Sequence, residues 1–258
     1  MTRFTRYRTA FQTILTKEIL RFSRIWVQTL VPPAITTTLY FIIFGNLIGQ
    51  RIGEMEGVRY IDFIVPGLIL MAVITNSYSN VVSSFFSSKY QRHVEELLIS
   101  PVPNWVILSG YVGGGVARGV LVGIVVTGVS LVFSDLDIRS YGWTLTVFVL
   151  TSILFALGGF INAVYAKDFD DISIIPTFVL TPLTYLGGVF YSISMLPDLW
   201  QVISLANPVL YMVNAFRYGL LGVTDIPIEI ALAIILAFIV GLTSFSLYLL
   251  NRGVGLKS

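Results

Sequence analysis

The stretch FIVPGLILMAVITNSYSNVVSSFFSS, residues 63–88, contains no charged side chain. It is longer than the roughly 20 apolar residues that an α-helix needs to cross the hydrocarbon core of a bilayer. Lipid offers no hydrogen bonds, so a helix is the form in which such a segment pairs its own backbone groups. The regular alternation of apolar and polar residues typical of a membrane β-barrel strand is missing. The stretch therefore predicts a transmembrane helix.

The composition of the whole chain agrees with this prediction. Hydrophobic residues make up 55% of the 258 residues, charged residues make up only 12%, and the mean hydropathy is +0.84. Ordinary soluble domains are about 25% charged. These charges are too few to cover a water-exposed surface, which excludes an ordinary water-soluble enzyme. The absence of cysteine also excludes disulfides, thiolate metal sites and thiol nucleophiles.

Five further stretches resemble the first one, and one of them is interrupted only by Arg118. Together they predict an all-α integral membrane protein with six transmembrane helices, at residues 25–50, 63–88, 104–134, 140–166, 172–197 and 230–251. Residues 192–227 contain apolar runs that are broken by prolines and charges. These runs are too short to cross, so re-entrant outer helices are predicted there, before the last span.

The distribution of basic residues predicts the orientation. An even number of spans places both termini on one side, and 11 of the 16 Lys and Arg residues lie on that side. Four lie on the opposite side, and Arg118 lies within a span. By the positive-inside rule, both termini are expected in the cytoplasm.

Residues 1–24 have the pattern of a basic amphipathic helix. Apolar residues recur at spacings of three and four, and the basic residues are expected to turn largely away from them. The apolar residues are Phe4, Tyr7, Phe11, Ile14, Leu15 and Phe22. Such a helix suits the anionic surface of the cytoplasmic leaflet, where lipid would be its partner. The alternative is that the charges only set the orientation of the first span.

The loop after the second span is the most polar cytoplasmic loop of the chain. Its sequence KYQRHVEELLIS, residues 89–100, predicts a short helix that ends before Pro101. Its apolar edge, at Val94, Leu97 and Leu98, is suited to docking in the groove of another protein. The alternative is a solvated hairpin between two spans. His93 is the only histidine, and no second histidine or cysteine can share a metal with it, so no metal-binding or catalytic role is assigned.

Arg118 is the one charge inside a predicted span, where a charge costs about 2.5–3.5 kcal/mol near the bilayer centre. It is expected to face protein or water. It is either a polar contact on the path of an anionic substrate or an arginine that pairs with a carbonyl or reaches the interface. Around it, Gly110, Gly114, Gly115, Gly119 and Gly123 give the small-residue spacing that lets helices approach closely.

Missing motifs narrow the function further. The sequence contains no Gly-Lys-Ser/Thr, and therefore no P-loop for ATP. No carboxylate lies well inside a span, which disfavours an ion-coupled secondary transporter. No span contains a set of side chains typical of a catalytic site, which disfavours a membrane-embedded enzyme. Both remain alternatives to a membrane channel whose energy comes from another protein.

These features resemble the ABC-2 type transporter permeases over essentially the whole chain. The carboxy-terminal signature of that family is matched in order by Gly187, Gly188, Pro197, Pro208, Tyr211 and Arg217. The spacing of this signature is far more specific than hydropathy. The chain is most similar to the bacterial inner-membrane permeases that are encoded as separate half-transporters.

The resemblance implies the permease subunit of an ATP-binding cassette exporter, with no catalytic residue, metal site or cofactor of its own. Two copies of this chain, as a homodimer, or this chain with a close relative, would join two cytoplasmic ATPase subunits that hold ATP and Mg²⁺. No nucleic-acid partner is implied. The coupling helix, at about residues 89–100, would contact the ATPase through Arg92, Glu95, Glu96 and Leu97.

The implied organisation has three parts. Residues 1–24 form a cytoplasmic interfacial helix, residues 25–251 form the transmembrane domain, and residues 252–258 form a cytoplasmic tail. Within the domain, the outer re-entrant segment at about residues 192–227 would shape the exit of the pathway. The family moves very different cargo, and the sequence does not identify the substrate of this chain.

Overall fold

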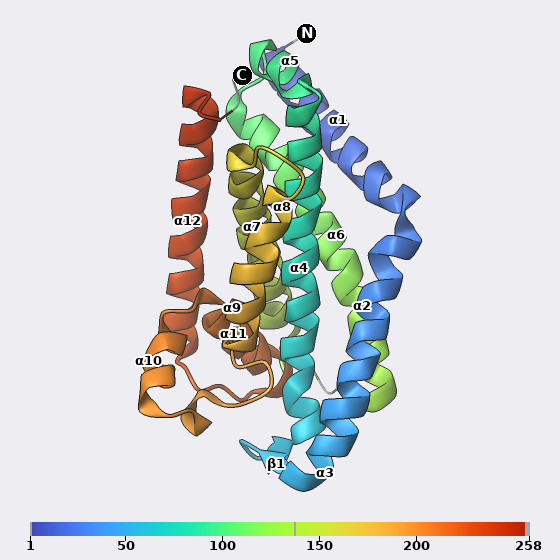
Figure 1. Cartoon of the computed structure of the whole chain (residues 1–258), viewed down its shortest axis with the longest axis vertical. Helices are drawn as coiled ribbons and strands as arrows, with labels where there is room; N and C mark the ends of the chain where they lie inside the picture. The colour runs from blue at the N-terminus through green and yellow to red at the C-terminus, as the bar shows by residue number, and fades with distance from the viewer. Residues whose placement is uncertain (1, 137, 256–258) are drawn as a thin grey trace.

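The computed structural model describes residues 2–136 and 138–255. In these ranges the chain forms a bundle of helices with one short β-hairpin at one end (Figure 1). The elements are α1 (Arg3–Arg24), α2 (Trp26–Tyr40), η1 (Phe41–Ile48), α3 (Gly49–Ile52), β1 (Glu54–Met55), β2 (Val58–Arg59), α4 (Tyr60–Tyr90), α5 (His93–Ile99), α6 (Asn104–Phe133), α7 (Tyr141–Tyr165), α8 (Asp171–Ile175), η2 (Pro176–Leu180), α9 (Thr181–Tyr185), η3 (Ile193–Met195), α10 (Asp198–Leu205), α11 (Pro208–Leu221) and α12 (Ile228–Arg252).

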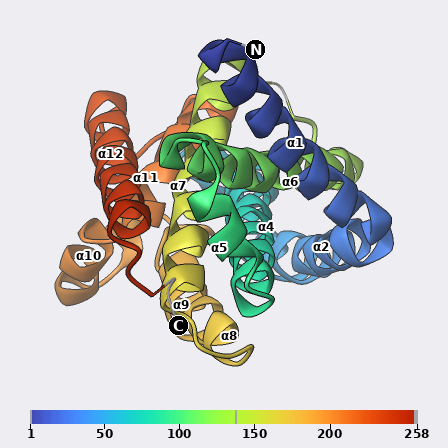
Figure 2. The same cartoon turned by 90° about the horizontal axis from the view of Figure 1, so that it is seen from above.

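The bundle has a buried centre and a lipid-facing rim. In the most apolar stretch of α4 and of α7, 72% of the residues are buried, compared with 17% in α2 and in α12. Viewed from above, α1 and α2 lie on one side of α4, and α10 and α12 lie on the other (Figure 2). Apolar side chains that stay exposed on a helix of this length are expected to meet lipid. The structure therefore confirms the predicted all-α integral membrane fold.

Five helical stretches of the described chain are long and apolar enough to cross a membrane. They are Trp26–Ile52, Tyr60–Tyr90, Asn104–Phe133, Tyr141–Tyr165 and Ile228–Arg252, and each contains most of one predicted span. A sixth is counted if α10 and α11, which are bent by 86° relative to each other, form one broken span. That bent pair lies within residues 192–227, where re-entrant helices were predicted.

The fifth predicted span, residues 172–197, is wrong in length. The continuous helix made by α8, η2 and α9 ends at Tyr185, and Gly188 follows with a left-handed backbone at φ 71°. Its 15 residues reach about 22 Å at 1.5 Å per residue, which is less than the roughly 30 Å of a hydrocarbon core. Hydropathy did not reveal this end because the residues after Tyr185 are as apolar as those before it.

The close approach predicted around Arg118 is present. On α6, Gly110 and Gly114 lie against Ile14 and Glu18 of α1, where an added Cβ would collide with these side chains. The next residue, Gly115, and Gly119 one turn further along lie against Ser77 of α4. These glycines let α6 pack directly against both α1 and α4.

One end of the bundle carries the start of α1, the end of α12 and helix α5, and the opposite end carries the hairpin and α10 (Figure 1). The hairpin turns at Glu56 and Gly57, both with positive φ, as a tight two-residue turn requires. Beside it, Arg59 donates hydrogen bonds to both carboxylate oxygens of Asp62, at 2.7 and 3.1 Å. These bonds raise the pKa of Arg59, and the charged pair marks this end of the bundle as facing water.

Candidate functional site

Helix α5 projects a charged face away from the bundle. Its preceding residue Arg92 has a left-handed backbone at φ 62°, and the carbonyl of Arg92 accepts a hydrogen bond from the N–H of Glu95 at 3.1 Å. This turn reverses the chain sharply after α4. Arg92, Glu95 and Glu96 are exposed, whereas Val94 is buried with 2% of its surface accessible.

The apolar edge predicted as a docking surface is therefore largely used inside the chain. Val94 belongs to the core, and Leu97 and Leu98 pack partly against it. The sequence pattern cannot distinguish a helix edge that meets its own bundle from one that meets a partner. The exposed apolar side chains near α5 are instead Tyr90 and Ile99, with 64% and 85% of their surface accessible. Ile99 was missed because it lies at the helix end, off the periodic edge.

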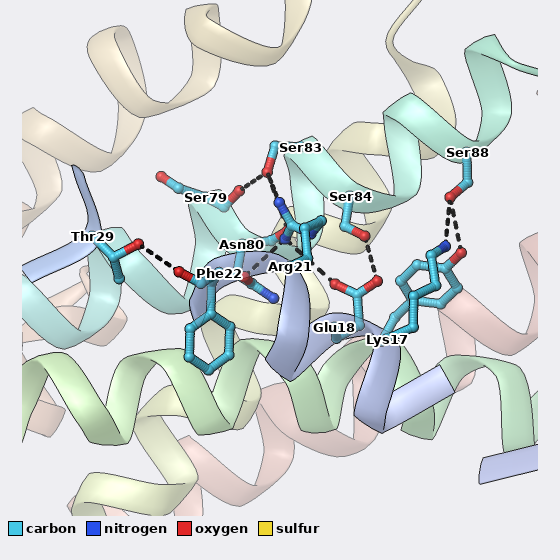
Figure 3. Close-up of polar contacts among 11 residues, drawn as sticks. Lys17, Glu18, Arg21, Phe22, Thr29, Ser79, Asn80, Ser83, Ser84 and Ser88 are labelled. Carbon is cyan, nitrogen blue, oxygen red and sulfur yellow. Dashed lines mark hydrogen bonds and ion pairs between the residues drawn. The ribbon is translucent and has the colours of Figure 1, made fainter. Parts of the chain in front are cut away.

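A buried polar contact joins α1 to α4 (Figure 3). Glu18 of α1 is fully buried and accepts a hydrogen bond from Ser84 Oγ at 2.5 Å. Arg21 donates through Nη2 to the backbone carbonyl and the side-chain oxygen of Asn80, both at 2.8 Å, and lies 3.4 Å from Glu18. Lys17 donates to Ser88 at 3.4 Å. Lys17 and Arg21 thus point onto α4 and not away from the bundle as the amphipathic pattern predicted.

Lys89 forms a second link next to α5. Its ammonium group donates hydrogen bonds to the carbonyls of Val164 and Ala166, at 2.5 and 2.7 Å. These carbonyls belong to the end of α7, where the last turn leaves acceptors unpaired. The segment that leads into α5 is therefore connected to both α1 and α7.

Replacing Glu18 with glutamine tests the α1–α4 contact. Glutamine keeps the volume but removes the charge that faces Arg21, so we expect a loss of about 1–3 kcal/mol in stability. The measurement is the melting temperature of the purified chain in neutral detergent. Arg8→Gln is the control, because Arg8 is exposed on the same helix. An unchanged melting temperature for Glu18→Gln would show that this contact does not hold α1 in place.

At the opposite end, the signature residues Arg217 and Gly188 contact each other. Arg217 of α11 is buried, donates through Nη2 to the carbonyl of Gly188 at 2.5 Å, and lies with its Cζ 3.8 Å from the ring centre of Phe63. A Cβ at Gly187 would lie 2.7 Å from Val209 Cγ1, which leaves room only for glycine. Arg217 therefore fixes the turn after α9 against both α11 and α4.

The remaining signature residues shape the bent pair α10–α11. Pro197 directly precedes α10, and Pro208 is the first residue of α11, a position where its missing N–H costs nothing. The hydroxyl of Tyr211 donates to the carbonyl of Leu205 at 2.6 Å and closes the bend from inside. The signature positions thus lie between the end of α9 and the end of α11, at the end of the bundle opposite α5.

Three polar residues within residues 192–227 have structural roles that were not predicted from the sequence. Asn207 donates to the carbonyl of Leu183 at 2.6 Å and accepts from Val209 N–H, which caps α11. Asp225 accepts from Ser192 Oγ at 2.8 Å, and its N–H donates to Asn214 Oδ1 at 3.0 Å. An asparagine within an otherwise apolar stretch was the available signal for Asn214.

Arg118 lies at the middle of α6 and points into a cavity between α2 and α4. Its Nε donates to Asn76 Oδ1 at 3.3 Å. It neither reaches the helix end nor pairs with a backbone carbonyl among the described residues. The cavity has a volume of about 440 Å³. In the same residues, no group of three or more His, Asp or Glu side chains is arranged to hold a metal ion.

Comparison with known proteins identifies the family of this chain. The ABC-2 type transporter family matches residues 9–221, which is more than half of the chain. The inner membrane transport permease YadH of Escherichia coli K12 is 58% identical over 252 residues, covering 98% of each chain. Nodulation protein J of Rhizobium meliloti strain 1021 is 25% identical over 188 residues, covering 71% of each. The chain belongs to the ABC-2 type transporter family and is a membrane transport permease.

Proposed function

We propose that this chain is the membrane-spanning subunit of an ATP-binding cassette exporter and that a separate cytoplasmic ATPase drives it through α5. The main support for the proposal is the position of α5. The short helix α5 leaves its charged residues exposed at the end of the bundle, while the adjoining end of α4 is tied to α1 and α7. A helix that is exposed on one side and firmly connected on the other suits the transfer of motion from a partner.

The proposed orientation of the chain in the membrane follows from the distribution of its basic residues. The end of the bundle with α5 also carries the start of α1 and the end of α12 (Figure 1). The chain places 11 of its 16 Lys and Arg residues in the segments assigned to this side, which favours a cytoplasmic location. Both termini would then be cytoplasmic. The printed name of the Escherichia coli relative supports the bacterial inner membrane as the location.

In the proposed assembly, two copies of this chain form the pathway and each binds one ATPase. ATP and Mg²⁺ are held by the ATPase, and this subunit holds no cofactor. Closure of the ATPase pair would displace α5, and α4 would carry the displacement along the bundle because it packs on α6, α7 and α11. Arg92, Glu95 and Glu96 would contact the ATPase, and Leu97 would support the helix from its inner side.

In this proposal, the segment from the turn after α9 to the end of α11 closes the outer end of the pathway. The helix made by α8, η2 and α9 enters from the cytoplasmic end, and α10 and α11 form a re-entrant pair at the outer end. The bond from Arg217 to Gly188 holds the two parts together. A rigid outer pair would turn as one unit when α4 moves, since Phe63 of α4 stacks on Arg217.

Affinity purification from native membranes in a mild detergent tests the proposal. We expect an ABC ATPase to co-purify in equal amount with the permease and to be identified by mass spectrometry. The purified pair should hydrolyse ATP, whereas the permease alone should not. If the chain instead transports or converts a substrate by itself, or loses transport when an ion gradient is collapsed, the proposal is wrong.

A further inference from the structure

The cavity beside Arg118 is a groove of mixed polar and apolar lining between α2 and α4. It runs along α2 from Gln28 to Tyr40 and along α4 from Leu68 to Ser79, and Arg118 of α6 lies in its wall. Each of these helix stretches is about 16–18 Å long at 1.5 Å per residue. The groove therefore extends over about half of the roughly 30 Å hydrocarbon core.

Polar side chains line the groove although one of its walls, α2, belongs to the lipid-facing rim. The two helices contribute amide and hydroxyl groups along its length: Gln28, Thr36 and Tyr40 from α2, and Thr75, Asn76 and Ser79 from α4. Apolar surface is also present, at Pro32, Pro33 and Met71. A groove with both kinds of surface suits a ligand that is itself amphiphilic, with a polar head and an apolar chain.

Arg118 gives the groove a positive charge that no carboxylate in its lining neutralises. The lining contains no Asp or Glu, and Arg118 forms no ion pair among the described residues. The carboxylate of Glu18, the buried acidic residue of α1, is already engaged by Ser84 and Arg21. With Nε bonded to Asn76, the other two guanidinium nitrogens have no hydrogen-bond acceptor among the described residues. They are left for a ligand.

Arg217, which is buried in α11, lacks the open guanidinium group that Arg118 has. Arg217 is 1% exposed, stacks on Phe63 and donates to Gly188, so its guanidinium is enclosed by protein. Arg118 is only half-buried and opens into the groove. Asn76 orients it, because the Asn76 amide nitrogen donates to the carbonyl of Ala72 and thereby directs its oxygen at Arg118.

We propose that this groove binds the anionic headgroup of an amphiphilic molecule, with the headgroup on Arg118 and the apolar chain along Pro32, Pro33 and Met71. A guanidinium offers paired donors to a phosphate or carboxylate, and the pairing is strong where water is largely excluded. The inference rests on the proposed function, since it names the class of cargo that the permease accepts. It also applies to the purified chain without its ATPase.

Binding of radiolabelled dodecyl phosphate to the full chain in neutral maltoside detergent tests the inference. Wild type should bind it at least tenfold more tightly than it binds uncharged dodecanol, measured by competition. Arg118→Gln should weaken binding of dodecyl phosphate at least tenfold, and Arg118→Lys should weaken it less. Arg51→Gln is the control, because Arg51 is exposed and lies outside the groove, and it should bind like wild type.

Asn76→Asp provides a second variant if Arg118→Gln does not fold. It keeps the arginine but places a carboxylate within hydrogen-bond distance of it, so the guanidinium is neutralised internally and dodecyl phosphate binding should fall at least tenfold. Equal binding of dodecyl phosphate and dodecanol, or wild-type affinity in Asn76→Asp, would overturn the inference. If inorganic phosphate competed as well as unlabelled dodecyl phosphate, the assignment to an amphiphile would be wrong and the groove would be a site for a free anion.

Three further outcomes distinguish a failure of this inference from a failure of the proposed function. If Arg118→Gln and Asn76→Asp change the oligomeric state while the probe shows no preference for charge, the groove is covered by a second copy of the chain and the inference fails. If an ATPase co-purifies but dodecyl phosphate does not bind selectively, the inference fails alone. Selective binding without any ATPase partner would leave the groove assigned and contradict the proposed function.

Discussion

Replacement of Gly159 with leucine is expected to prevent the bundle from folding. Gly159 of α7 lies against the backbone of α4, and a Cβ there would be 2.5 Å from the carbonyl oxygen of Tyr78. The obstacle is main chain, so no side-chain rotation can relieve it. Overpacking a core costs about 1–3 kcal/mol, and a clash between two rigid helices should exceed 3 kcal/mol. The measurement is the yield of monodisperse protein on size-exclusion chromatography.

Gly142→Leu is the matched control for this effect. It makes the same substitution on the same helix, but no atom lies within 4 Å of a Cβ at Gly142. Leucine is also a better helix former than glycine, by up to about 1 kcal/mol in a helix interior, so local propensity should destabilise neither variant. Only the packing between α4 and α7 distinguishes them. Wild-type yield for Gly159→Leu would mean that the two helices do not meet as described.

Reversing the charge of α5 is expected to abolish the response of the permease to ATP. In the double variant Glu95→Lys and Glu96→Lys, the exposed face proposed to contact the ATPase changes sign, while Val94 still anchors the helix. We expect at least a tenfold smaller ATP-dependent change in the fluorescence of a dye on Leu199→Cys, which lies on the exposed face of α10. Folding and assembly with the ATPase should be retained.

Glu54→Lys with Glu56→Lys is the control for the charge reversal. These two glutamates are exposed in the β-hairpin at the opposite end of the bundle. They carry the same charge change but lie far from α5, so the fluorescence response should equal that of wild type. A normal response in the α5 variant would remove Glu95 and Glu96 from the coupling surface.

The sequence predicted the parts of the fold that depend on the contrast between lipid and water. Charge-free stretches located the long helices, and the fold class and the family resemblance are both confirmed. The basic and apolar spacing of residues 1–24 predicted α1, which runs from Arg3 to Arg24. These features follow from local composition, because the solvent around a segment selects its side chains.

Contacts between segments could not be predicted in the same way. Lys17 and Arg21 looked like surface charges, yet they reach Ser88 and Asn80 of α4. The end of the helix at Tyr185 depends on Gly188 and its bond to Arg217, which come from distant parts of the sequence. The roles assigned to Arg92, Glu95, Glu96 and Leu97 remain predictions, since they concern a partner protein.

Cross-linking from a single cysteine tests the central claim that a separate ATPase drives this permease through α5. The chain contains no cysteine, so His93→Cys creates a unique thiol on the exposed face of α5, and Glu54→Cys creates one at the opposite end. A thiol-to-amine reagent is applied to membranes that contain the permease and its co-purifying ATPase. The account predicts a permease–ATPase conjugate with His93→Cys and none with Glu54→Cys. A conjugate with Glu54→Cys, or none with His93→Cys while the complex is intact, would contradict it.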